Sequence, residues 1–401
     1  MKALWLFSVA AISLFAAAQT VEYDAGAFID KALQNGYEPR YLELQLQRAS
    51  IALTHRAVWE NPELTLERGN GTDSQTSTRI ELSQPLALWG TGSQKAHDRH
   101  RFESAKAQNE ASRHTLAIDA ARLYNRLYFI QAAIKITDDQ ITKVDRLLAI
   151  AAARVDSGEI APIEAARIAV AKEQLLSARA GLWQHELTLQ SQARLWLQRD
   201  ETVLAKEPID YKTPPPSPDR IDELPDIRAL KSEAQAQKSN LSAQKSQRLP
   251  AVQVLVFQEQ TQGAGLDKET ASGFGVGLSL PLWNQNRLAI EQARIDAQQS
   301  ELKAAQIAQQ KALLLNQERL LYQESLVQEA RFTQSVERAR AFYEAQALKF
   351  KTGENTLLEL LDAHAFYLET RLTHNELAAQ SADRYLNLCA SAFVSPLKET
   401  R

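Results

Sequence analysis

Two long stretches of the chain, 94–154 and 286–351, contain neither proline nor glycine. Both are rich in Ala, Leu, Gln, Glu, Lys and Arg, which are strong helix formers. At about 1.5 Å per residue, each stretch predicts a helix on the order of 90–100 Å long. Helices of ordinary globular domains average about 11–12 residues. The chain is therefore expected to be mainly α-helical and elongated.

The chain contains two copies of one plan. The sequence Leu-Ser-Gln-Pro-Leu at 82–86 recurs as Leu-Ser-Leu-Pro-Leu at 278–282, and a Trp follows each copy. The other landmarks that recur in the same order are the helix-opening Pro39 and Pro225, the helix-closing Pro62 and Pro250, and the turns at Gly158 and Gly353. Landmarks displaced by nearly the same distance indicate an internal duplication.

Residues 1–18 resemble a secretory signal peptide, because one Lys precedes an apolar run that ends in three alanines before Gln19. A buried N-terminal helix is the alternative. No Cys follows the cleavage site, so no lipid anchor is expected. The predicted division is a signal peptide (1–18), a first repeat (19–207), a Pro-rich extended linker (208–218) and a second repeat (219–401), with both repeats forming one structural unit.

Each half is predicted to contain the same elements. They are a lead-in helix near 24–58 and 219–248, two strands near 62–69 and 77–86 or 251–260 and 272–282, the long helix, a Gly turn, and a shorter helix near 162–199 and 355–392. The two shorter helices of each half, laid end to end, are about as long as the long helix. We therefore expect a layer in which short helices stack in tandem against long ones.

The strands alternate apolar with polar or small residues. Their apolar members are Leu64, Leu66, Ile80, Leu82, Phe274, Val276, Leu278 and Leu280. Such alternation is typical of transmembrane β-barrels, although a half-buried sheet in a soluble domain has the same period. The signal peptide and the aromatic Trp59, Trp89 and Trp283 at one end of the strands favour the membrane. Four strands cannot close a barrel, for which about eight are needed, so several chains must share one.

The residues around the two turns resemble those of the TolC-like outer membrane efflux proteins. The sequence GENTLLELLDA at 353–363 is similar to that family's G-E-x-S-x-L-D-V-L-D-A turn, with Thr356 in place of Ser and Glu359 in place of Asp. The sequence GEIAPIEAAR at 158–167 and NPEL at 61–64 resemble the heavy-metal (CzcC-type) branch. The resemblance covers the whole mature chain.

The resemblance implies a homotrimer in the outer membrane with a long periplasmic extension. Duplicated helical hairpins would form a trimeric α-barrel, topped by a β-barrel to which each chain gives four strands. It would be a passive exit duct, expected to carry heavy-metal cations, and would contact outer membrane lipid, a periplasmic membrane fusion (adaptor) protein and an inner-membrane resistance-nodulation-division pump. The adaptor-contacting tip would comprise Arg154, Gly158, Glu159, Pro162, Glu164, Lys351, Gly353, Glu354, Leu357, Glu359 and Asp362.

Nothing in the sequence predicts an enzyme. It has no nucleotide, nucleophile-elbow or zinc-protease motif, so no catalytic residue, cofactor or metal site is expected. His97 and His100 could share a metal, but no third ligand is evident. The balance of 46 basic and 49 acidic residues gives no footprint for nucleic acid.

Several alternatives remain open from the sequence. The carboxylates near the turns could form a charged ring at a pore constriction or stabilise helix N-termini. The channel could instead export drugs or other organic compounds, or serve type I secretion. A periplasmic coiled-coil adaptor and a secreted enzyme are the alternatives from other classes of protein.

Overall fold

The computed structural model describes residues 19–54, 59–70, 76–216, 218, 220–262, 268–352 and 354–397. The predicted signal peptide and Gly353 lie outside the described residues. The first half contains β1 (Gln19–Tyr23), α1 (Ala25–Asn35), α2 (Tyr37–Thr54), β2 (Glu63–Asn70), β3 (Thr76–Leu86), α3 (Thr91–Asp156), α4 (Pro162–Leu197) and β4 (Glu201–Ala205). The second half contains the short 3-10 helix η2 (Ile221–Glu223), α5 (Pro225–Ser246), β5 (Ala251–Gln262), β6 (Glu269–Ser279), α6 (Arg287–Thr352) and α7 (Leu357–Ala392).

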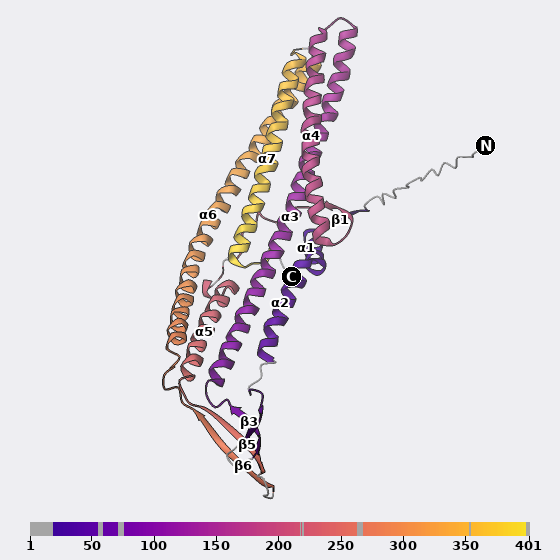
Figure 1. Ribbon diagram of the computed structural model, residues 1–401. Helices are drawn as coiled ribbons and strands as arrows, with labels where there is room; N and C mark the ends of the chain where they lie inside the picture. The colour runs from indigo at the N-terminus through magenta and orange to yellow at the C-terminus, as the bar shows by residue number, and fades with distance from the viewer. Residues whose placement is uncertain are drawn as a thin grey trace, which may run out of the picture.

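The molecule is long and narrow, with a sheet at one end and the turns of two helical hairpins at the other (Figure 1). The helices α3 and α6 have 66 residues each and run along most of its length. In the half near the sheet the helices lie in the order α2, α3, α5, α6, and in the half near the turns the order is α4, α3, α7, α6 (Figure 1). Short helices thus stack in tandem against long ones, as the sequence predicts.

The first lead-in helix, expected as one element over 24–58, is two helices that meet at Gly36. Pro39 has no N–H to bond the carbonyl four residues earlier, so a continuous helix would lose a hydrogen bond and its ring would clash. A Cβ at Gly36 would lie 2.7 Å from the carbonyl oxygen of Ala32. The close approach of the backbone at this break therefore requires glycine.

A small parallel sheet of β1 and β4, which the sequence pattern did not reveal, lies near mid-length. It belongs to the larger of two apolar clusters, whose fully buried members include Phe28, Leu127 and Val203. The segment expected to be a linker, 208–218, packs on this cluster: Ile209 is buried and its N–H donates to Oδ1 of Asn125 at 3.0 Å. The two halves are therefore joined through the core.

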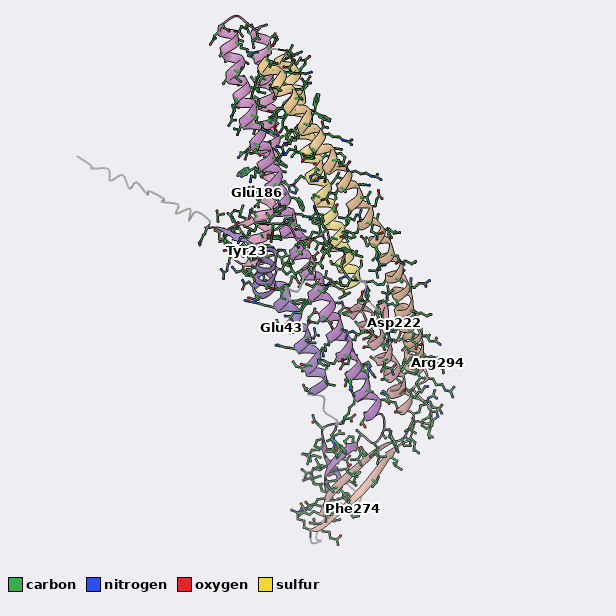
Figure 2. The ribbon with its side chains drawn as sticks, turned by 180° about the vertical axis from the view of Figure 1, so that it is seen from behind. Tyr23, Glu43, Glu186, Asp222, Phe274 and Arg294 are labelled. Atoms are coloured by element: carbon green, nitrogen blue, oxygen red, sulfur yellow. The ribbon has the colours of Figure 1, made fainter. Side chains whose placement is uncertain are left out.

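The duplication extends to individual hydrogen bonds. In each half a tyrosine of the long helix donates its hydroxyl to the backbone carbonyl of a tyrosine that precedes the lead-in helix. Tyr124 donates to Tyr23 at 2.9 Å, and Tyr322 donates to Tyr211 at 2.6 Å. Burial raises the pKa of both donors to about 12, so they stay protonated at neutral pH. Figure 2 shows Tyr23 near the middle of the molecule.

The larger sheet is antiparallel throughout, in the order β2, β3, β5, β6, so β2 and β6 are its edges. Strand β6 ends at Ser279, which pairs with Ala251. Leu280, expected within a membrane strand, lies just beyond that end. Its position in the ladder would oppose Pro250, which has no N–H to continue the pairing.

Candidate functional site

One face of the four-stranded sheet is apolar. Because successive side chains of a strand point to opposite faces and the register aligns Leu64, Leu82 and Val256 across the strands, the apolar residues gather on one side. The exposed members are Leu64, Leu66, Ile80, Leu82, Val254, Val256, Phe274, Val276 and Leu278. Phe274, labelled in Figure 2, is 87% exposed. A contiguous apolar surface of this kind marks an interaction with a partner or a lipid phase.

The opposite face of the sheet is polar. It carries Glu63, Thr65, Glu67, Arg79, Glu81, Ser83 and Glu259. Arg79 pairs with Glu81 at 2.7 Å, and its guanidinium carbon lies 4.3 Å from the ring centre of Phe257. That ring covers Gly273, where a Cβ would approach it to 2.8 Å. Glycines of β6 therefore make room on this face for larger side chains of β5.

Three exposed tryptophans surround the end of the sheet that joins the helices. Trp59 precedes β2, Trp89 follows β3 and Trp283 follows β6. The indole Nε1 of Trp89 donates to the carbonyl oxygen of Pro250 at 3.0 Å, which ties the two strand pairs together. The structure thus places all three at the end where the sequence pattern predicted an aromatic group.

The turn between α3 and α4 is shaped by backbone conformation. Gly158 has a φ of +74°, and no heavy atom lies within 4 Å of its would-be Cβ, so conformation and not space requires glycine. The N–H of Glu159 donates to the carbonyl of Arg154 at 2.8 Å. Nε of Arg154 lies 3.8 Å from Oε2 of Glu159, so the two side chains also form an ion pair. Pro162 opens α4 at its first turn, where a missing N–H costs nothing.

The turn between α6 and α7 ends in a capping box. Oγ1 of Thr356 accepts the N–H of Glu359 at 3.2 Å, and the Glu359 carboxylate accepts the N–H of Thr356 at 3.1 Å. Asn355 donates from Nδ2 to the carbonyl of Gln346 at 3.0 Å. Glu359 therefore stabilises the N-terminus of α7, one of the two roles that the sequence left open for these carboxylates.

The two turns lie together at one end of the molecule. The guanidinium carbon of Arg154 lies 4.5 Å from the ring centre of Phe350, and Leu357 is buried in a second apolar cluster shared by all four hairpin helices. A cavity of about 150 Å³ separates α4 from α7 and is lined by Glu164 and Leu357, among others. The remaining charged residues expected at the tip, Lys351, Glu354 and Asp362, are exposed.

Phe350, which packs against Arg154 and belongs to the second apolar cluster, is a residue of the tip that the sequence pattern did not indicate. Its signal is its spacing on α6, seven residues after Tyr343 and three after Ala347, which pack on the same cluster. One member of the histidine pair packs against a neighbouring helix: Nδ1 of His97 lies 2.9 Å from the carbonyl oxygen of Ala236 on α5.

The described residues contain neither a metal-binding cluster nor a membrane-spanning helix. No group of three or more His, Cys, Asp or Glu in them could hold a metal ion. In the same ranges, no helix combines the length and the apolar character needed to cross a bilayer.

The chain is similar in sequence and in fold to known outer membrane proteins. No protein-family model matches the chain. It is 23% identical, over 75% of its length and 67% of the relative's, to the pyoverdine export outer membrane protein OpmQ of Pseudomonas putida. The channel protein CusC superposes with a TM-score of 0.78 at 16% identity, covering 95% of both chains. The open outer membrane channel MtrE of Neisseria gonorrhoeae gives 0.75 at 14%, covering 94% of this chain and 90% of its own. The predicted fold class is confirmed: the chain has the fold of outer membrane channels that join a helical barrel to a β domain.

Proposed function

We propose that the chain is one subunit of a TolC-like outer membrane efflux channel, with its sheet in the lipid and its helices in the periplasm. The sheet carries this proposal, because one face is apolar and exposed while the other bears charged residues. That distribution suits a barrel wall with lipid outside and water inside. The strands have 8 to 12 residues, close to the length that a tilted strand needs to cross a bilayer. The fold shared with CusC and MtrE supports the same proposal.

A homotrimer is the proposed assembly. The sheet has an even number of strands and free edges at β2 and β6, so β6 of one copy can pair antiparallel with β2 of the next. Three copies would supply twelve strands, and a barrel larger than about eight strands leaves room for an aqueous channel.

The outer helices of the layer offer matching surfaces for the neighbouring copies. Exposed apolar residues on α6 form two runs with seven-residue spacing, 288–302 and 313–327, and α2 carries a stripe of its own at the other side. They are Leu288, Ile295, Leu302, Leu313, Leu320 and Val327 on α6, and Tyr37, Tyr41, Leu44 and Ile51 on α2. Apolar stripes with this period pack long helices side by side.

The proposed mechanism is passive. A pump of the inner membrane supplies energy, an adaptor protein docks at the hairpin turns, and the ring of helices conducts the substrate outward without chemistry. Heavy-metal cations are the proposed substrate, on the resemblance of 158–167 to the CzcC-type branch. The similarity to OpmQ favours an organic substrate as the second candidate. Comparing a deletion strain with its parent for sensitivity to metal salts and to siderophores separates these two candidate substrates.

The location of the sheet is tested with a matched pair of variants. Leu64 and Thr65 are adjacent on β2 but point to opposite faces. A cation on the lipid face costs about 2–4 kcal/mol near the midplane, so Leu64→Arg should strongly reduce the heat-modifiable trimer in the outer membrane fraction. Thr65→Arg, which faces the lumen, should assemble normally. Equal yields from the two variants would refute the assigned faces.

The role of the turns is tested separately. Glu354 and Asp362 are exposed charges with no part in the cap, so reversing both should reduce cross-linking to the adaptor and lower resistance while the trimer persists. Thr356→Ala is the control, because it weakens the cap without changing charge. Normal cross-linking by the charge-reversed protein would remove these residues from the docking surface.

A further inference from the structure

A groove of about 810 Å³ lies where the helices meet the sheet. Its walls come from the end of α2, the entry to β2, the end of β3, the start of α3 and the end of α5. It combines aliphatic and indole side chains with charges of both signs. The residues used below are Leu53, Trp59, Glu60, Leu88, Trp89 and Lys95.

The groove opens on the apolar face of the sheet. Gln84 is two residues beyond Leu82 on β3 and therefore points to the same, apolar face. Its Nε2 donates to the backbone carbonyl of Glu60 at 2.9 Å, so the chain entering β2 crosses on that side. Leu86, another residue of this face, lines the groove itself. The groove is thus continuous with the surface that we assign to lipid.

Most of the groove lies away from the edges that the proposed trimer closes. Its lining from β3, β5, α3 and α5 belongs to the central strands of the sheet and the central helices of the layer near it, whereas Leu53, Trp59 and Glu60 lie at the α2 and β2 edge. The free edges that the proposed trimer closes are on β2 and β6. Because the groove opens on the apolar face of the sheet, we expect its occupant to come from the surrounding lipid.

The charges of the groove fit a zwitterion. Lys95 is exposed, one turn into α3, and within the described residues its ammonium has no ion-pair partner. Glu60, at the entry to β2, also lines the groove and is exposed. A phosphate would accept hydrogen bonds from Lys95 while an ammonium donates to Glu60. A purely anionic headgroup would satisfy Lys95 but would be repelled by Glu60.

The apolar part of the groove fits the rest of such a lipid. Leu53 and Leu88 offer aliphatic surface, and the indole rings of Trp59 and Trp89 stand at the height where tryptophan favours the boundary between lipid and water. We propose, resting on the membrane location inferred above, that this groove binds one zwitterionic aminophospholipid per subunit from the periplasmic leaflet of the outer membrane.

Native mass spectrometry of the purified trimer tests the proposal with three probes of matched acyl chains: phosphatidylethanolamine, phosphatidylglycerol and phosphatidylcholine. We expect three retained phosphatidylethanolamine molecules per trimer. Lys95→Glu should lower this occupancy by about tenfold, the effect of one charge-assisted hydrogen bond. Lys349→Glu, a change at an exposed lysine near the far end of α6, should leave the occupancy unchanged.

A second measurement locates the bound lipid. Phosphatidylethanolamine with brominated acyl chains should quench the fluorescence of Trp89, taken as the difference between the parent protein and Trp89→Phe, and quenching should fall in Lys95→Glu. Trp183 on α4 is the control indole and should not be quenched. Equal retention of the three lipids, or retention insensitive to Lys95→Glu, would overturn the proposal. Trimer yield in the outer membrane, measured alongside, reports on the channel assignment independently.

Discussion

A buried histidine near the hairpin turns predicts that acid loosens this end of the molecule. His364 on α7 is 2% exposed, its ring lies 5.4 Å from that of Tyr343, and its Nε2 has no hydrogen-bond partner among the described residues. Burial, and then the positive charge of Lys143, lowers its pKa to about 4 from an ordinary 6.5. The imidazole is therefore neutral in the folded tip at neutral pH.

The direction of the effect follows from proton binding. Below pH 6.5 the unfolded segment binds a proton that the folded segment does not, so the stabilisation is complete above pH 6.5 and is lost as the pH falls toward 4. With a pKa of about 4 folded and about 6.5 unfolded, the loss is about 2 kcal/mol at pH 5 and about 3 kcal/mol at pH 4.

Hydrogen exchange measures this loss locally. Protection factors of the amides in the first half of α7 should fall by about thirtyfold between pH 7.5 and pH 5. His364→Phe keeps a ring in the core but cannot titrate, so its protection factors should be nearly the same at both values. His374→Phe is the matched control, because that histidine lies on the same helix, is only half-buried and contacts Thr333. A thirtyfold fall that persists in His364→Phe would refute the assignment.

Three further substitutions test local contacts. Gly273→Val should destabilise the sheet by about 1–3 kcal/mol, because a Cβ there meets the Phe257 ring at 2.8 Å. The dissociation temperature of the trimer on unboiled gels measures this loss of stability. Adding Phe257→Ala to the variant should restore the parent temperature. Thr356→Ala should cost about 1 kcal/mol, seen as faster amide exchange confined to the first turn of α7. Tyr322→Phe leaves the buried carbonyl of Tyr211 without its donor and should lower the denaturant midpoint by the equivalent of about 1–3 kcal/mol; an unchanged midpoint would count against this bond.

The elements that the sequence predicted well are those with local signals. The helices α3 and α6 begin and end within a few residues of the expected bounds, because composition and the absence of Pro and Gly act along the helix itself. The break at Gly36 departs from the expected single helix over 24–58, because Pro39 both opens α2 and prevents a helix from continuing through the residues before it.

The elements that were missed depend on distant partners. Strands β1 and β4 have five residues each and pair across about 180 positions of the chain, so neither has a pattern that predicts it alone. At the turns, the contact between Arg154 and Phe350 joins two different hairpins. The cap of Thr356 and Glu359, in contrast, is visible in the sequence as Thr-x-x-Glu before an apolar run.

The repeated tyrosine-to-carbonyl bond has a consequence for symmetry. Tyr124 with Tyr23 and Tyr322 with Tyr211 form the same bond in each half, and each half gives two strands and one helical hairpin. The ring of three chains that we propose would therefore be built from six similar units and would approach sixfold symmetry. A substitution in one half alters every second unit around the axis, so changing both members of a repeat-related pair is needed to alter the whole circumference.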